Sequence, residues 1–214
     1  MESTMNTSSI IEGIAAVQRS LRASEAEIES LDRAIGDGDH FINVMRGCEA
    51  LSALSPQLAA LSPGQACQQI GSKLVATVGG ASGPLFGSFF LSMGKELDGA
   101  EAPGARHFAH AFAAGVEAIR SRGKADVGEK TMLDVLIPVS RLLVRLTETG
   151  ADLATVTERV REEATGGMLA TKDMVATKGR AHFLGERAIG HVDPGAKTCQ
   201  VAIAAVCDQV LAAA

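Results

Sequence analysis

The sequence predicts an all-α fold, an antiparallel bundle of helices forming a single domain over residues 1–214. Apolar residues recur at spacings of three and four along most of the chain, as on the buried face of a helix. Strict alternation of apolar and polar residues, which is typical of strands, is hard to find. The connections are short and rich in Gly, Pro and Ser, so neighbouring helices are expected to run antiparallel, with no linker dividing the chain.

Two stretches carry the strongest helical periodicity, residues 10–21 and 132–146. Thr131 and Asp134 resemble a capping box at the start of the second stretch, with aspartate in place of the usual glutamate. By the same spacing, the remaining helices are expected at 24–35, 39–53, 64–78, 84–97, 104–122, 151–164 and 196–213.

The composition argues against several classes of function. The net charge is −5, no basic stretch stands out, and there is no Trp or Tyr to stack on bases, so no nucleic-acid binding is expected. The N-terminus lacks the cationic start and long apolar core of a secretion signal, so a cytoplasmic protein is expected. Residues 74–94 are uncharged and long enough to span a membrane, but five glycines and a proline favour a buried loop and helix instead.

The four cysteines are expected to be buried free thiols. No two of them form a CxxC pair, and all lie in predicted helices. A zinc site or a disulfide framework is the alternative. The cysteines are Cys48, Cys67, Cys199 and Cys207.

Three carboxylates crowd a short stretch where a helix is expected to end. Asp32 falls in the last helical turn, and Asp37 and Asp39 follow between glycines. Gly36 is expected to end the helix with a positive φ. Carboxylates beside the negative end of a helix dipole are unfavourable unless a cation neutralises them, and oxygen-only ligands favour Mg²⁺ or Ca²⁺.

The spacing of these aspartates favours magnesium over an EF-hand calcium site. Counting from Asp37, the last ligand position of an EF-hand loop falls on Cys48 rather than on a glutamate. Magnesium keeps several waters and relies on substrate phosphates, so it suits an incomplete set of carboxylates. The alternative is a solvated turn in which Asp39 caps the following helix.

The glycine-rich stretch "GGASGPLFG", residues 79–87, has the parts of an anion-binding site. It matches neither the P-loop nor the dinucleotide-binding pattern. Its glycines expose backbone N–H groups, and Ser82 offers a hydroxyl. Pro84 suits the first position of a helix, whose free N–H groups would face a phosphate. The alternative is a tight turn between two helices.

The segment 176–198 is irregular and rich in Gly, Arg and His. Arg180, between small residues, is a candidate to bind a phosphate. Asp193 is expected to cap the final helix, with Pro194 at its first position. Further upstream, His40 directly follows the aspartates and is therefore expected at the edge of the metal site.

Four motifs stand in order along the chain: "LDRAIGDGDHFIN", "GGASGP", "RGKADVGEKTM" and "KGRAHFLGERAIGHVDPGA". Together they resemble the nucleotide-binding L subunit of the dihydroxyacetone kinase family, over nearly the whole chain. Each motif alone is weak, but their order and spacing are specific. The resemblance implies a barrel of eight antiparallel helices, with nucleotide and magnesium at one rim.

By this resemblance, Asp32, Asp37 and Asp39 would hold two Mg²⁺ ions that bridge the phosphates of ADP or ATP. The chain departs from the family at Phe41 and Ile42, where smaller residues are usual, so their bulk is expected to limit close approach of the backbone to the nucleotide. No catalytic residue is assigned in this subunit. The residues that would contact the nucleotide are His40, Phe41, Ile42, Asn43, Ala81, Ser82, Gly123, Met132, Arg180, Asp193, Pro194 and Gly195.

The resemblance also implies a function shared between subunits. This chain would transfer a phosphoryl group from its nucleotide to dihydroxyacetone held by a partner K subunit. Its ADP would be recharged in place by a phosphohistidine-bearing M subunit fed from phosphoenolpyruvate. The alternatives are an ATP-dependent kinase for dihydroxyacetone, erythrulose or a similar short ketose, and a nucleotide-loaded regulatory protein that binds a transcription factor. A homodimer is also compatible with the resemblance.

Overall fold

The computed structural model describes residues 6–100 and 102–214. These residues form nine α-helices, with two short 3₁₀ segments after the eighth and no strand. The 3₁₀ segments are η1 (Thr171–Asp173) and η2 (Arg180–Ala188). The helices are α1 (Thr7–Ala23), α2 (Glu25–Ile35), α3 (His40–Leu58), α4 (Pro63–Thr77), α5 (Ser82–Glu96), α6 (Ala105–Gly123), α7 (Leu133–Glu148), α8 (Leu153–Ala170) and α9 (Pro194–Ala212).

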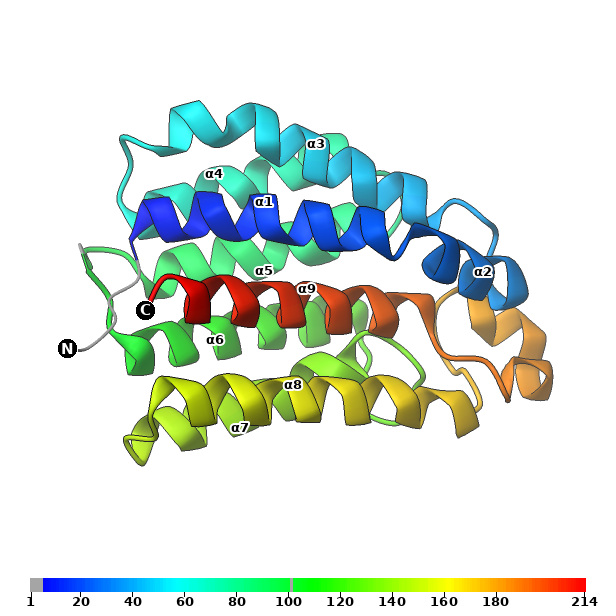
Figure 1. Ribbon diagram of the computed structural model, residues 1–214. Helices are drawn as coiled ribbons and strands as arrows, with labels where there is room; N and C mark the ends of the chain where they lie inside the picture. The colour runs from blue at the N-terminus through cyan, green and yellow to red at the C-terminus, as the bar shows by residue number, and fades with distance from the viewer. Residues whose placement is uncertain (1–5, 101) are drawn as a thin grey trace.

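Eight of these helices close into a ring, which confirms the predicted antiparallel eight-helix barrel. From α3 to α9 each helix packs against the next in the chain, and α1 closes the ring between α9 and α3. The short helix α2 lies at one end, against α3 and α9 (Figure 1). Because successive helices reverse direction, α3, α5, α7 and α9 all begin at that same end, on the right of Figure 1. We call this end the rim and the opposite end the far end.

Glycines bring α4 and α5 into backbone contact. A Cβ atom on Gly71 would lie 2.8 Å from the carbonyl oxygen of Gly87, and one on Gly94 would lie 2.7 Å from that of Gly64. Both distances are too short for any side chain, so the two helices can pack this closely only because they lack side chains here. The uncharged stretch 74–94 therefore forms part of the barrel wall, with Val75 and Leu91 exposed on its surface. Within the described chain, no helix combines the length and apolarity needed to cross a membrane.

Several helix boundaries differ from those predicted. Helix α3 continues to Leu58 and contains Pro56 in its last turn, so the helix extends beyond the predicted end at the cost of one backbone hydrogen bond. Helix α8 continues to Ala170, so the stretch after residue 164 is helix rather than loop. Helix α5 begins at Ser82, which places Pro84 at its third position rather than its first. A proline is accepted there because the first N–H groups of a helix have no partner within it.

The four cysteines are free thiols, as predicted, and three of them are buried. Burial raises the pKa of Cys67 and of Cys199 to about 12. A thiol with so high a pKa is uncharged at neutral pH and unreactive, so these residues act as small apolar groups of the core.

Candidate functional site

The three aspartates of the predicted metal site meet at the rim. One carboxylate oxygen each from Asp32, Asp37 and Asp39 can be chosen so that all lie within 4.8 Å of one another. Asp32 comes from the last turn of α2 and is buried, whereas the other two lie exposed in the loop before α3. An oxygen-only cluster with one buried and two open members suits Mg²⁺, which keeps some of its waters.

The turn after α2 holds the buried carboxylate of Asp32 in place. Its Oδ2 atom accepts a hydrogen bond of 3.0 Å from the backbone N–H of His40. A Cβ atom on Gly36 would lie 1.8 Å from Oδ1 of the same carboxylate. Gly36 has a φ of −119°, so the prediction of a positive φ was wrong. Glycine is required at this position because the Asp32 side chain occupies the space of a side chain there.

Asp39 stands before α3 without capping it. The residue has a helical backbone conformation (φ −106°, ψ −3°), and its side chain makes no capping hydrogen bond. Capping needs the extended conformation that this residue lacks, so its carboxylate is left facing the cluster. The predicted alternative, a solvated turn capped by Asp39, therefore loses its main interaction.

Arg180 lies beside the aspartate cluster, although it is far away in the sequence. Its Nη2 atom is 2.9 Å from Oδ2 of Asp37; the Arg180 side chain is largely exposed and that of Asp37 is about one-third exposed. The guanidinium thus offsets part of the negative charge at this point of the rim. Arginine also binds phosphate with fixed geometry, so the same side chain suits a contact with a nucleotide phosphate.

His40 connects the aspartate loop to α9. Its Nε2 atom lies 2.8 Å from Oγ1 of Thr198, with which it shares a hydrogen bond. Burial lowers the pKa of His40, while the charges of Asp32, Asp39 and Asp37 act in the opposite direction with less effect. The imidazole is thus placed at the edge of the metal site, as the sequence indicated.

Phe41 and Ile42 point in different directions. The Phe41 side chain is 7% exposed and packs with Leu21, Ile28 and Met45 in the core. Ile42 is 63% exposed. The bulk of Phe41 is therefore turned away from the rim surface, and the expected obstruction of the backbone does not arise from it. Its predicted nucleotide contact could involve only its backbone.

The loop between α4 and α5 approaches the start of α3. A Cβ atom on Gly79 would lie 3.4 Å from Oδ1 of Asn43, and Gly80 has a φ of +65° that favours glycine. Ala81 precedes α5 with a helical backbone and no side-chain cap. The first N–H groups of α5, those of Ser82 and Gly83, therefore remain available to an anion.

The starts of α7 and α9 are also close together. A Cβ atom on Gly195 would lie 3.7 Å from Cβ of Met132. The Asp193 side chain caps α9, as predicted, by accepting a hydrogen bond of 2.7 Å from the N–H of Ala196. Burial raises the pKa of Asp193 to about 7. Gly123 ends α6, and a Cβ atom on it would lie 3.4 Å from the side chain of Leu85 in α5.

Three residues of the rim were missed by sequence reasoning. Thr198 is the partner of His40, and Lys130 and Thr171 link segments behind the start of α9. Lys130 lies within the motif "RGKADVGEKTM", for which the family resemblance implied nucleotide contacts only at Gly123 and Met132. A lysine in a charged loop is usually solvated, so only its burial in the fold distinguishes it.

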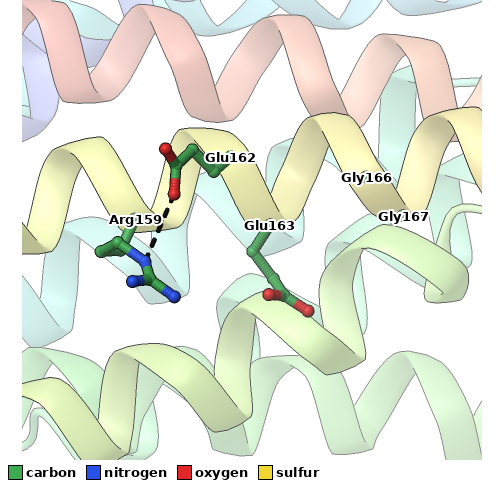
Figure 2. A pocket seen from close by; sticks show the side chains of 5 residues that line it. All are labelled: Arg159, Glu162, Glu163, Gly166 and Gly167. Atoms are coloured by element: carbon green, nitrogen blue, oxygen red, sulfur yellow. Dashed lines mark ion pairs between the residues drawn. The ribbon is translucent and has the colours of Figure 1, made fainter.

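Two hollows on the outer surface do not coincide with the rim residues. One, of about 190 Å³, is lined by five residues of α8 (Figure 2). Figure 2 shows Arg159 paired with Glu162, while Glu163 points toward the neighbouring α7. This hollow is smaller than a typical ligand site and acidic, so it does not suit a nucleotide. A larger groove of about 700 Å³ runs along α3 and α4 and is lined mainly by glutamine and apolar residues.

Comparison with known proteins identifies the family. The model of the DAK2 domain matches residues 34–208. The chain belongs to the DAK2 domain family. This match begins inside α2, just after Asp32, and ends in α9, so it spans Asp37, Asp39, the glycine-rich loop and the start of α9.

Several curated relatives of this DAK2 domain are subunits of similar length. It is 44% identical over 169 residues, 79% of each chain, to the ADP-binding subunit of PEP-dependent dihydroxyacetone kinase 1 of Listeria innocua. It is 38% identical over 175 residues, 81% of this chain and 83% of the relative, to the corresponding subunit of Escherichia coli. It is also 34% identical, over 81% of its own length but only 30% of the relative, to L-erythrulose 1-kinase of Mycolicibacterium smegmatis.

Among solved structures, the DAK2 domain resembles the dihydroxyacetone kinase of C. freundii crystallised with AMP-PNP and Mg²⁺. The TM-score is 0.73 at 24% sequence identity, over 97% of this chain and 34% of that chain. At this identity the likeness establishes the shared all-α fold.

Proposed function

We propose that this DAK2 domain is the ADP-binding subunit of a phosphoenolpyruvate-dependent dihydroxyacetone kinase. Its higher identities, 44%, 38% and 39%, are to subunits that carry this description in Listeria innocua, Escherichia coli and, as a PTS-dependent enzyme, Lactococcus lactis. In this role the chain holds ADP and Mg²⁺ and presents a phosphoryl group to a ketose on a partner subunit. In this role the protein acts in the cytoplasm, where cysteines such as those of this chain are usually reduced.

One observation carries this proposal: the aspartate cluster lies at the same end of the barrel as the uncapped start of α5. Asp32, Asp37 and Asp39 would hold Mg²⁺. The free N–H groups at the start of α5, together with Arg180 beside Asp37, would bind the phosphates. When bound, Mg²⁺ neutralises phosphate charge and the nucleotide supplies the phosphoryl group.

The residues of the rim position the phosphates but provide no nucleophile. Phosphoryl transfer depends mainly on positioning and on neutralising charge, which aspartates, helix N-termini and an arginine can supply. His40 is hydrogen-bonded to Thr198, which orients the imidazole but gives it no carboxylate partner of the kind a general base uses. Activation of the ketose therefore falls to a partner K subunit, and renewal of the phosphoryl group to a phosphohistidine-bearing M subunit.

A second candidate is an ATP-dependent kinase of a short ketose. This reading is favoured by the 34% identity to L-erythrulose 1-kinase of Mycolicibacterium smegmatis and to triokinase/FMN cyclase of Homo sapiens. This chain spans only 30% and 32% of the length of those two proteins. Both candidates use the same rim, so they differ in whether the nucleotide stays bound or exchanges.

The variant Asp37→Asn tests the metal site. It removes one negative charge from the cluster, so Mg²⁺-dependent binding of ADP should weaken about tenfold or more. Isothermal titration calorimetry with and without Mg²⁺ measures the effect. Asp152→Asn is a matched control, since Asp152 caps α8 at the far end and asparagine caps equally well. Unchanged ADP affinity in Asp37→Asn would refute the assignment.

The two modes can be separated by what the purified protein carries. Protein prepared without added nucleotide is denatured, and the supernatant is analysed for nucleotide. One ADP per chain would support recharging in place, because the nucleotide then remains bound through many cycles. An empty site with rapid ATP exchange would favour the ATP-dependent kinase instead.

A further inference from the structure

Lys130 is a buried lysine in the connection between α6 and α7. Its side chain is 1% exposed, and its backbone has a φ of 60°, in the left-handed region that residues other than glycine rarely adopt. Burying an ammonium group and holding a strained backbone both reduce stability. A residue with both of these costs is kept only where the surrounding structure holds it in place. The contacts of Lys130 show which segments it holds together.

The ammonium group of Lys130 joins two segments that are distant in the sequence. Its Nζ atom donates to the carbonyl oxygen of Thr171, at 2.5 Å, and to that of His191, at 2.6 Å. Thr171 begins η1 directly after α8, and His191 lies in the turn before α9. A single side chain therefore ties the start of α7 to the end of α8 and to the start of α9.

A chain of hydrogen bonds continues from these carbonyls to the cap of α9. Thr171 is fully buried, and its Oγ1 atom accepts a hydrogen bond of 3.0 Å from the N–H of Asp193. Asp193 in turn caps α9 through the N–H of Ala196. The position of the turn 191–195 at the rim thus depends on the contacts that Lys130 makes beneath it.

Glu129, the neighbour of Lys130 in the chain, joins the same connection to the segment 174–179 from the solvent side. Its carboxylate accepts hydrogen bonds from Oγ1 of Thr177, at 2.8 Å, and from the N–H of Asp126, at 2.7 Å. The N–H of Thr177 donates to the Glu129 carbonyl at 3.3 Å. Glu129 and Lys130 together form what we call the clasp. Lys130 is its buried member, so a ligand at the rim cannot reach the Lys130 side chain.

We propose that Lys130 is a positioning residue for nucleotide binding. It holds the turn 191–195 so that Asp193, Pro194 and Gly195 face the nucleotide beside Met132, without touching the ligand itself. This inference rests on the proposed function, because it takes that turn to be part of the nucleotide site. A direct phosphate contact does not fit, since the side chain is buried and directed at two backbone carbonyls.

The variant Lys130→Met tests the inference, because methionine fills similar space without an ammonium group. The affinity for ADP in the presence of Mg²⁺ should fall about tenfold or more, by analogy with other residues that orient a ligand-binding group. Amide hydrogen exchange should quicken in peptides covering 190–197 and stay unchanged in α4 and α5. Lys197→Met is a matched control: Lys197 is 14% exposed and pairs with Glu27 at 3.0 Å, so its loss removes a covered lysine without touching the clasp.

Four outcomes separate this inference from the proposed function. If wild type does not bind ADP, the proposed function fails, and the exchange pattern still tests the positioning. If wild type binds ADP and Lys130→Met binds it equally well, the positioning role is overturned. Faster exchange spread evenly over the barrel would also overturn it, because that pattern marks general destabilisation. If Lys130→Met does not fold, the variants Thr171→Val and Thr171→Ser test the positioning role instead. Only valine removes the hydroxyl that accepts the hydrogen bond from the Asp193 N–H.

For that pair, Thr171→Val should lose affinity for ADP and Thr171→Ser should keep it. Equal affinities in the two variants would show that the link from Lys130 to Asp193 does not position the nucleotide.

Discussion

The two ends of the barrel differ in how their helices begin. At the far end, the residues before α1, α4, α6 and α8 have extended backbones, and side chains cap three of these four helices. At the rim, the residues directly before α3, α5 and α7 have helical backbones and make no capping hydrogen bond of their own. The side chain of Asp193 caps α9, Thr131 accepts from the first N–H of α7, and Asp32 accepts from that of α3, so that α5 is left without a side-chain acceptor. The capping side chains of the far end are those of Asn6, Ser62 and Asp152.

Because of this difference, the helix starts of the far end contribute to stability, whereas the rim keeps donors for a ligand. A capped N-terminus uses its free N–H groups within the chain and gains stability, whereas an uncapped one keeps them for a ligand. The far end contains none of the predicted metal or nucleotide residues. The rim contains all of them, and the missing cap of α5 leaves its N–H donors open to phosphate.

Adding a negative charge at the rim should produce the largest effect. In Ala81→Asp a carboxylate would stand at the start of α5, where it is favoured by the helix dipole and repels phosphate. We expect ADP affinity to fall about a hundredfold or more. Without ligand, the free energy of unfolding should rise by about 0.3–1 kcal/mol. Calorimetry with ADP and Mg²⁺, together with denaturant unfolding, measures both.

Ala81→Asn is the control for this charge, because asparagine has nearly the same shape as aspartate. If Asn and Asp reduced ADP affinity equally, crowding rather than charge would explain the loss. If neither had an effect, the start of α5 would not face the phosphates.

An intermediate effect is expected from the ionisation of Asp193, which caps α9 at the rim. Burial raises the pKa of Asp193 to about 7 in the folded protein, above its unfolded value, so the folded state holds this proton more tightly. The resulting stabilisation is complete below the unfolded pKa and is lost as the pH rises through the folded one. Relative to Asp193→Asn, wild type should therefore lose roughly 1–3 kcal/mol of unfolding free energy between about pH 5 and pH 8.

Chemical denaturation of both proteins at a series of pH values gives this difference directly. Asparagine keeps the oxygen that caps α9, so the comparison isolates the ionisation. A difference that does not vary with pH would mean that Asp193 is ionised throughout, as a solvated cap would be.

The smallest effect should come from the far end. Ser62 and Gln65 form a reciprocal capping box at the start of α4. Ser62→Ala should lower the free energy of unfolding by about 1 kcal/mol. The affinity for ADP should stay unchanged, because this cap lies at the opposite end from the aspartates. A loss of affinity in this variant would show that the two ends are not independent.

Local sequence features predicted much of the fold. The spacing of apolar residues located every helix of the ring, and Asp193 with Pro194 marked the start of α9 correctly. Both are short-range properties, set by the period of the helix and by the N–H groups at its first turn. Boundaries failed at Pro56 and Pro84, which lie inside helices, and at the end of α8. Pro84 is accepted because the N–H groups of a first turn have no partner within the helix, whereas α3 continues past Pro56 although one hydrogen bond is lost.

The sequence by itself determined that this chain is helical and that three aspartates lie close together around the end of one helix. Only the tertiary structure decided what surrounds them. It brought Arg180 beside Asp37, turned Phe41 into the core and buried Lys130 behind the start of α9. These contacts join segments far apart in the chain, and they arise from the packing of whole helices, which no local pattern records.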